Sequence, residues 1–266
     1  LLADGDRMGE LLDKATTIEQ HQNITRALTK FAGSVPGIMR EYRGHTIYAG
    51  GDDVLGFVPL DSAYDCAQAL AQHFADALQK PATQLQAERP PTLSVGLAIA
   101  HINTPLGHIR SLAVRAERVA KGDQSAPDKQ RNALGITLAV RSGSISDIRL
   151  RWDDSDAHLA FQGWINAFCD KQLPSRIAYD ARAIYQRTDF GITADPTLLR
   201  NIRNAELTRM LAQACTRDGI KLDPKQTDAL RTRHDALADL NALANELITA
   251  RWLTAKTQRD IGKEEQ

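Results

Sequence analysis

The stretch YAGGDDVLGFVPL, residues 48–60, decides the fold, because it places a Gly-Gly-Asp-Asp turn between two apolar runs. The flanks HTIYA and VLGFV are rich in β-branched and aromatic residues, which favour strands. A short glycine-containing link between two such strands is typical of a tight hairpin. Asp52 and Asp53 then lie at its tip, where successive side chains diverge unless the tip is twisted or a cation gathers them. This stretch alone fits an ordinary Asp-containing turn equally well.

A second acidic element, LLADGDRMGELL, begins the chain and reads as the end of a strand followed by a helix. Asp4 and Asp6 are two residues apart, so both can point to the same side of the strand. If this strand lies beside the hairpin, three or four carboxylates converge. Two such charges at about 4 Å repel by roughly 4 kcal/mol at an effective dielectric constant near 20, so the cluster calls for cations. With oxygen ligands and no nearby His or Cys, we expect Mg²⁺ or Mn²⁺.

Composition narrows the class of protein. The chain has 266 residues, enough for one large or two modest domains, and its 33 Lys plus Arg balance 33 Asp plus Glu. Any nucleic-acid surface must therefore be local. Cys66, Cys169 and Cys215 form no metal or redox motif, which favours a reducing compartment. Without a long apolar run or a signal peptide, we expect a cytoplasmic protein that does not enter a membrane. The start without Met, inside a strand, indicates a larger polypeptide.

The periodicity predicts the element order β-α-β-β-α-β-α-β, a ferredoxin-like core with an added helix and strand. Beyond about residue 145 the pattern becomes polar and then almost wholly helical, with Asp195-Pro196 and Asp223-Pro224 as helix starts. The predicted class is α+β, with domains at residues 1–145 and 146–266. The predicted elements of the first domain are a strand ending near Asp4, a helix over residues 8–31, the hairpin, a helix over 62–79, a loop over 79–91, a strand over 92–101, a helix over 105–121, a loop over 122–130 and a strand over 132–140.

Three strings, DGDRMG, GGDD and SVGLAIA, occur in this order on that scaffold. Together they resemble the Palm, or nucleotide-cyclase, domain of the large signalling subunit of type III CRISPR effector complexes. The DGD-x-MG form is similar to the Cmr branch, subtype III-B. The resemblance covers about residues 1–145, and the helical continuation is similar to that subunit's C-terminal domain without a motif of its own.

The resemblance implies a nucleotidyltransferase that makes cyclic oligoadenylates from ATP with two Mg²⁺ or Mn²⁺ ions. It implies Asp4, Asp52 and Asp53 as metal ligands, the two hairpin acids being the catalytic pair. Asp6 is a further candidate ligand, although the second acid of this triplet can instead be structural. The implied partners are guide RNA, target RNA, other effector subunits and a second Palm domain upstream in the full-length chain.

Five further residues are candidates for nucleotide binding. Gly50 and Gly51 have no side chains to keep a triphosphate off the hairpin backbone. The strings AERVAK and QRNAL are similar to the phosphate-steadying motif of related diguanylate cyclases, which implies Lys121 and Arg131 as its cations. Inserted residues separate the two here, and solvated surface positions are the alternative for both. Ser94 offers a hydroxyl from the adjacent strand, or is a tolerated core residue.

Two other functions stay open at this point. One is a non-catalytic scaffold, a degenerate Palm domain that only organises the ribonucleoprotein. Converging acids disfavour it, since a structural turn has no need for them. The other is a stand-alone diguanylate cyclase, although Asp53 is not followed by the Phe of that family's signature. The helical half has no acid cluster or Gly-rich loop, so we expect it to dock helical subunits or guide-bound RNA.

Overall fold

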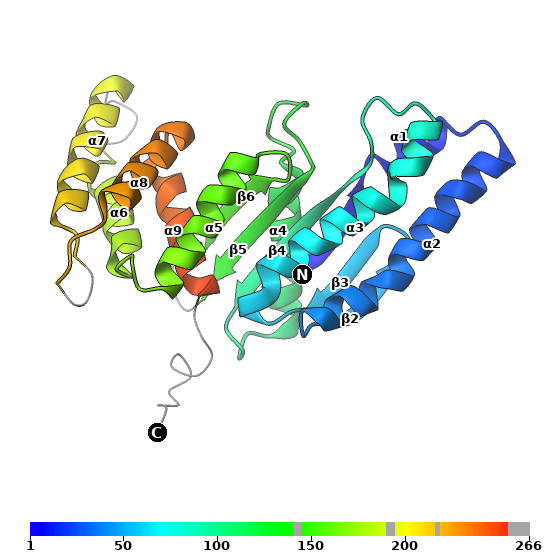
Figure 1. Cartoon of the computed structure of the whole chain (residues 1–266), viewed down its shortest axis with the longest axis horizontal. Coiled ribbons are helices and arrows are strands. Elements are labelled where there is room, and N and C mark those ends of the chain that lie inside the picture. Colours follow the sequence, from blue (N-terminus) through cyan, green and yellow to red (C-terminus); the bar gives the residue numbers. More distant parts are fainter. Residues whose placement is uncertain (141–144, 190–194, 216–218, 255–266) are drawn as a thin grey trace. The chain divides into compact units, whose positions relative to one another are not determined.

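The computed structural model of the chain describes residues 1–140, 145–189, 195–215 and 219–254. Contacts divide the chain into two compact units, Leu1–Asp154 and Ser155–Gln266. The first unit is built on a β-sheet and the second on helices (Figure 1). The predicted α+β class is therefore confirmed.

The first unit contains a six-stranded sheet in the order β2-β3-β1-β4-β5-β6. Neighbouring strands are antiparallel except for β4 and β5, which are parallel and joined through α4. The order of the first four strands is that of the predicted ferredoxin-like core. The strands are β1 (Leu2–Asp6), β2 (His45–Gly50), β3 (Asp53–Phe57), β4 (Thr92–Ala100), β5 (Ala133–Ala139) and β6 (Ser146–Arg151).

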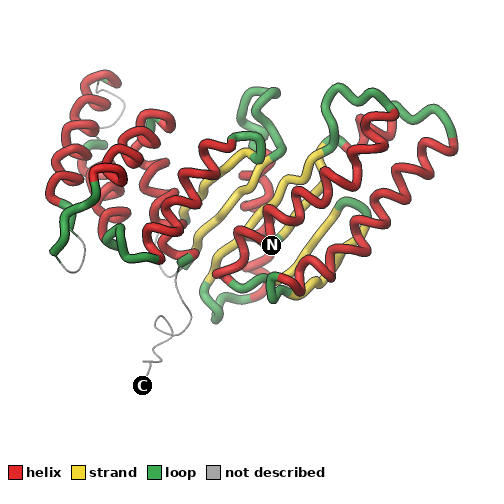
Figure 2. The backbone as a smooth tube through the Cα atoms, viewed as in Figure 1, coloured by secondary structure: helices red, strands yellow, loops and turns green. Residues whose placement is uncertain are grey.

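Helices cover both faces of this sheet (Figure 2). α2 and α3 pack on each other on one face, where the rings of Phe31 and Phe74 meet edge to face with centroids 5.0 Å apart. α4 lies on the other face against β4 and β5. The helices of the unit are α1 (Met8–Asp13), α2 (Ile18–Glu41), α3 (Ala63–Gln84), preceded by the short 3₁₀ helix η1 (Leu60–Ser62), and α4 (Leu106–Lys121).

The first helices differ from the prediction. Instead of one helix over residues 8–31 there are two, because Thr17 starts α2 with a capping box that it shares with Gln20. α2 then continues through Pro36 and α3 through Pro81, well past their predicted ends. Buried side chains recur at helical spacing on both sides of each proline, and their burial offsets the hydrogen bond that the proline lacks.

Strand β6 is the element that the sequence analysis missed. The string SDIRLR was expected to be a polar transition, yet Ser146, Ile148 and Leu150 are buried while the residues between them are partly exposed. This period of two is that of a strand with one covered face. β6 pairs with β5 through residue 151, so residues 146–154 belong with the sheet rather than with the helices that follow.

The second unit is helical over its described residues. Asp195 and Asp223 cap α7 and α8 with Pro at the first helical position, which confirms the two predicted helix starts. A buried ion pair between Arg233 and Glu246, 2.6 Å long, joins α8 to α9. No helix of the described chain has the length and apolarity needed to cross a membrane. The helices are α5 (Ser155–Cys169), α6 (Arg176–Arg187), α7 (Pro196–Gln213), α8 (Pro224–Leu237) and α9 (Leu240–Leu253).

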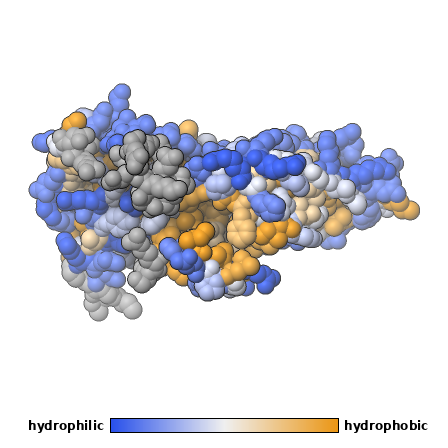
Figure 3. Space-filling model, turned by 90° about the horizontal axis from the view of Figure 1, so that it is seen from below, coloured by the Kyte–Doolittle hydropathy of each residue, from blue (hydrophilic) through white to orange (hydrophobic). Residues whose placement is uncertain are grey.

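Apolar side chains also remain on the surface. Among them are Ile47, Tyr48 and Phe57, which belong to β2 and β3 at one edge of the sheet. Tyr48 lies opposite Leu55, which lies opposite Leu2, so Tyr48 shares its sheet face with the alternate residues of β1. Figure 3 shows one face of the molecule, where an apolar region lies within a mostly polar surface.

The close approach of α4 to the sheet gives a test of this packing. A Cβ added at Gly135 would collide with the backbone of Ala116 and Ala120 in α4. We therefore expect Gly135→Ala to lower the free energy of unfolding by about 1–3 kcal/mol, the usual cost of overpacking. Gly107→Ala is the matched control, because a Cβ there meets nothing within 4 Å. Chemical denaturation measures both, and equal stability of the two variants would contradict the packing.

Candidate active site

Strand β1 ends in two acids that share a face of the sheet but have different surroundings. Asp4 lies opposite Ser94 on β4, and Asp6 lies opposite Thr92. The side chain of Asp4 is 35% exposed, whereas that of Asp6 is fully buried. The structure therefore separates two residues that the sequence grouped as metal ligands.

The exposed carboxyl group of Asp4 meets that of Asp53. Asp53 opens β3 opposite Gly50, and β3 runs beside β1. Burial raises the pKa of Asp53, and the charge of Asp4 together with a hydrogen bond to it raises that pKa further. Two carboxyl groups this close favour a shared proton or a bound cation over two free charges.

The other hairpin acid, Asp52, points elsewhere. A Cβ added at Gly5 would lie 2.6 Å from the Cβ of Asp52 and 2.9 Å from Phe74 of α3. Gly5 alternates with Asp4 along β1, so Asp52 lies on the opposite side of the sheet from Asp4 and Asp53. Burial raises the pKa of Asp52, a hydrogen bond from its own backbone lowers it, and the charge of Asp4 raises it.

The expected convergence of three or four carboxylates is thus reduced to a pair, Asp4 and Asp53. Over the residues that the structure describes, no group of three or more His, Cys, Asp or Glu side chains is arranged to hold a metal ion. The alternation of side chains across a strand explains this, since nothing in the hairpin twists the adjacent acids onto one face.

The two hairpin glycines have different roles. Gly51 is the first residue of a two-residue turn, and its φ of +63° is the positive value that such a turn favours. A Cβ added at Gly51 would meet nothing within 4 Å. At Gly50, by contrast, the missing side chain leaves room that the phenol of Tyr48 occupies. The backbone at Gly51 is therefore open to a ligand, whereas Tyr48 covers the backbone at Gly50.

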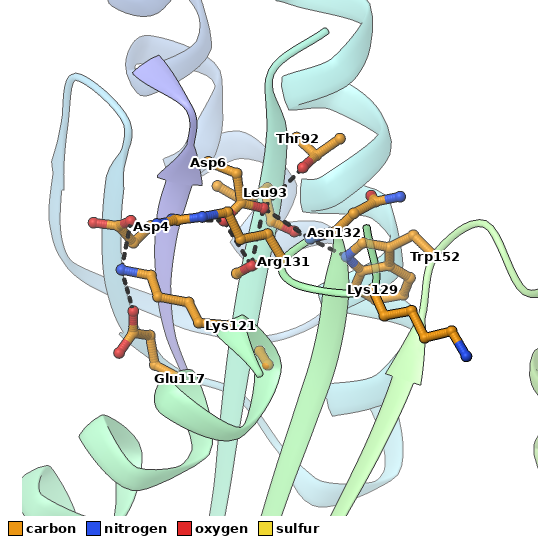
Figure 4. A network of polar contacts seen from close by, with 12 residues as sticks. Asp4, Asp6, Thr92, Leu93, Glu117, Lys121, Lys129, Arg131, Asn132 and Trp152 are labelled. Carbon is orange, nitrogen blue, oxygen red and sulfur yellow. Dashed lines mark hydrogen bonds and ion pairs between the residues drawn. The ribbon is translucent and has the colours of Figure 1, made fainter. Parts of the chain in front are cut away.

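Lys121 brings a positive charge to this pair from the last residue of α4 (Figure 4). Its Nζ lies 2.9 Å from Asp4 and 2.6 Å from Glu117, one helical turn earlier. Burial alone would lower the pKa of Lys121. Its hydrogen bonds to Glu117 and Asp4 outweigh the effect of burial, so the pKa of Lys121 is raised. The sequence analysis missed Glu117, although its i,i+4 spacing to Lys121 was a usable signal.

Asp6 forms the centre of an interior polar network (Figure 4). Its carboxylate accepts hydrogen bonds from the hydroxyl groups of Thr92 and Ser94, at 2.8 Å each, and from the backbone N–H of Asn132 at 3.0 Å. The guanidinium of Arg131 lies 3.7 Å away. Asp6 and Ser94 are fully buried and bonded to each other, so their positions favour a structural role over the predicted contacts with a metal and a nucleotide.

The residues inserted between Lys121 and Arg131 fold into a closed loop. The N–H of Arg131 donates to the carbonyl of Lys121 at 2.7 Å, which joins the two ends. Inside the loop, the side chain of Gln130 donates to the carbonyls of Asp123 and Ser125. The insertion therefore leaves both predicted phosphate-binding cations next to the acids of β1, with Lys121 at Asp4 and Arg131 at Asp6.

This arrangement fits a magnesium–nucleotide site. Mg²⁺ is commonly bound by one or two carboxylates, with substrate phosphates completing its shell. Asp4 and Asp53 offer two such groups beside a hairpin turn whose Gly51 is open. Lys121 and Arg131 add two cations at the same edge of the sheet. Asp52 faces the other side, and Asp6 is already saturated by protein donors.

A cavity of about 460 Å³ in the second unit is an alternative site. It lies between α6 and α7, and its lining includes Arg176, Arg187 and Arg209. Arg176 is paired with Asp180, and Arg209 with Glu206. Its lining has neither a carboxylate pair nor a glycine turn, so the chemistry favours the site at Asp4 and Asp53.

Comparison with known proteins identifies the family of the first unit. Residues 1–135 match the family described as Cas10/Cmr2, second palm domain. A relative from Pyrococcus furiosus, named CRISPR system Cmr subunit Cmr2, is 30% identical over 175 residues. That match covers 65% of this chain but 18% of the relative, so most of the relative's length has no counterpart here.

The carboxyl pair predicts a dependence of stability on pH. Because the folded pKa of Asp53 is raised, the protein loses stability as the pH rises from the ordinary carboxyl pKa through that raised value. We expect Asp53→Asn to raise the free energy of unfolding at pH 7 without divalent cations. The gain should be below about 1 kcal/mol because solvent screens the pair. It should shrink as the pH falls through the raised pKa, and a gain that does not change with pH would contradict the pairing.

Proposed function

Because the chain belongs to the Cas10/Cmr2 family and contains its second palm domain, we propose that it is a metal-dependent nucleotidyltransferase. The proposed reaction joins ATP into cyclic oligoadenylates, with two Mg²⁺ or Mn²⁺ ions. The observation that carries this proposal is the contact of the Asp4 and Asp53 carboxyl groups beside Lys121. In a purely structural domain, the repulsion between two adjacent carboxylates would only lower stability, whereas a cation site requires such a pair.

Different residues of the chain would bind the cations and the triphosphate in such a reaction. When bound, the cations supply neutralisation of the phosphates and activation of the attacking ribose hydroxyl. Asp4 and Asp53 would hold them, and the open backbone at Gly51 would let the triphosphate approach. Lys121 would exchange its contact with Asp4 for a phosphate oxygen as a cation takes its place. Positioning and charge carry phosphoryl chemistry of this kind, so no covalent role of the protein is required.

An acceptor nucleotide needs a second surface. Tyr48 and Phe57 are about half exposed on the sheet face that carries Asp4 and Asp53. An exposed apolar face beside a nucleotide site supports pairing with a second palm domain in the full-length subunit. That domain would present the ribose hydroxyl, and such orientation can be worth about 7–11 kcal/mol of barrier.

We also propose that the subunit works within an RNA-guided complex, with guide RNA, target RNA and other effector subunits as partners. The name of the relative, a Cmr subunit of a CRISPR system, supports this. The helical unit Ser155–Gln266 would supply docking surface, since its described residues lack the acid pair and the glycine turn of the first unit. The alternative, a non-catalytic scaffold in the same complex, predicts no effect of the acids on nucleotide chemistry.

Asp52 and Asp53 point to opposite faces of the sheet, so replacing each one separately tests the site more directly than replacing both. In the assembled effector complex with target RNA and ATP, we expect Asp53→Ala to lower oligoadenylate formation by about 10²-fold or more, because a charge aimed at the reacting phosphates is lost. Asp52→Ala is the matched variant on the other sheet face and should have the smaller effect. Product analysis by chromatography and mass spectrometry measures both.

Assembly and binding of the target RNA serve as controls and should be unchanged in the two variants. Near-normal synthesis by Asp53→Ala would refute the assignment of this site. A larger loss in Asp52→Ala than in Asp53→Ala would show that the hairpin rearranges when ATP binds.

A further inference from the structure

Strand β6 lies outside residues 1–135, which match the family, yet one of its side chains holds the loop that carries Arg131. We propose that Arg149 is a positioning residue of the nucleotide site. It clamps the loop 122–132 so that Arg131 is held where it can meet phosphate. This inference rests on the proposed function and adds to it a residue from an element that carries no known motif.

One guanidinium makes two contacts with this loop and one with the helix end that precedes it. Its Nε donates to the carbonyl of Ala120 at 2.9 Å, while one terminal nitrogen donates to the carbonyls of Lys129 at 2.8 Å and Arg131 at 3.0 Å. Ala120 precedes the loop, and Lys129 and Arg131 lie at its far end. Arg149 therefore adds a second tie between the two ends of the insertion, and its planar guanidinium with several donors suits this geometry.

The beginning of the loop is shaped around this side chain. Gly122 ends α4 in the left-handed region, with a φ of +61°. A Cβ added there would lie 2.7 Å from Nε and 2.8 Å from Cζ of Arg149. Glycine thus serves two needs at this residue, the positive φ and the space for the guanidinium.

The end of the loop is strained, and side chains from β1 and β6 help to hold it. Arg131 and Asn132 both have positive φ, 64° and 49°, which is uncommon for residues other than glycine. Such a conformation persists only where the surroundings impose it. Asp6 of β1 accepts the N–H of Asn132, and Arg149 of β6 donates to the carbonyl of Arg131. Without Arg149, the side-chain bond to the carbonyl of Arg131 is lost. The backbone bonds of Arg131 to Lys121 and of Trp152 to Asn132 remain, so the turn is held less firmly but not released altogether.

A second arginine between α4 and β6 offers a matched control. Arg115 of α4 pairs with Asp147 of β6, with Nε and Oδ2 3.0 Å apart, and its side chain is 48% exposed. It touches none of the residues 122–132. Arg115→Gln therefore removes an arginine contact between the same two elements without releasing the loop.

The experiment uses the full-length subunit in its effector complex, with ATP, Mg²⁺ and target RNA. We expect Arg149→Gln to raise the KM for ATP about tenfold while kcat changes less than about twofold, as for a lost binding contact. Arg149→Lys keeps the positive charge but lacks the planar guanidinium with its several N–H donors, so it should resemble Arg149→Gln. Arg115→Gln should leave both constants unchanged.

A double-mutant cycle separates positioning from general damage. If Arg149 acts through Arg131, Arg149→Gln should add nothing once Arg131→Ala is present. Hydrogen exchange gives a readout without activity, since the amides of Arg131 and Asn132 should exchange faster in Arg149→Gln and not in Arg115→Gln. Should Arg149→Gln fail to fold, Gly122→Ala displaces the same guanidinium and should give the same result.

Additive effects of Arg149→Gln and Arg131→Ala, or unchanged exchange of the loop amides, would overturn the proposal. A wild-type complex that makes no oligoadenylate would count against the proposed function instead. The exchange measurement would then still decide whether Arg149 holds the loop.

Discussion

The site proposed in the first unit depends on one contact, the approach of the Asp4 and Asp53 carboxyl groups across β1 and β3. Two acids in this position destabilise the fold unless a proton, a lysine or a cation offsets their charge. Lys121 supplies part of that charge from α4, and α4 can reach Asp4 because the sheet below it lacks side chains at Gly96 and Gly135. The charge that Lys121 brings to the site therefore depends on the close packing of α4 against the sheet.

The interior network around Asp6 complements this surface pair. Asp4 and Asp6 stand on the same face two residues apart, but one faces solvent and the other is buried among hydroxyl groups and backbone donors. Asp4 is partly exposed and paired with Lys121, so it is accessible to a ligand, whereas the buried Asp6 fixes the strand and the strained turn at Arg131. The insertion between Lys121 and Arg131 is tolerated because its ends are bonded to each other, so its length does not move the two cations apart.

Much of this could be predicted from the sequence, and the failures have identifiable causes. The apolar flanks of the hairpin predicted β2 and β3, and the alternation of apolar segments predicted the order of the first four strands. The location of the site remains a prediction. The strand β6 was missed because half of its residues are charged, and those charges include Arg149. The opposite directions of Asp52 and Asp53 follow from strand alternation, and the resemblance to a cyclase family had suggested otherwise. Contacts such as Ser94 with Asp6 depend on pairing between distant strands, which periodicity alone does not reveal.

The most direct test of the central claim is a crystal structure of the protein with Mn²⁺ and a non-hydrolysable ATP analogue, with manganese located by its anomalous scattering. The account predicts manganese bound by oxygens of both Asp4 and Asp53, with the triphosphate along Gly51 and a phosphate oxygen at Lys121. Manganese held by other residues, or a nucleotide bound within residues 155–254, would contradict it.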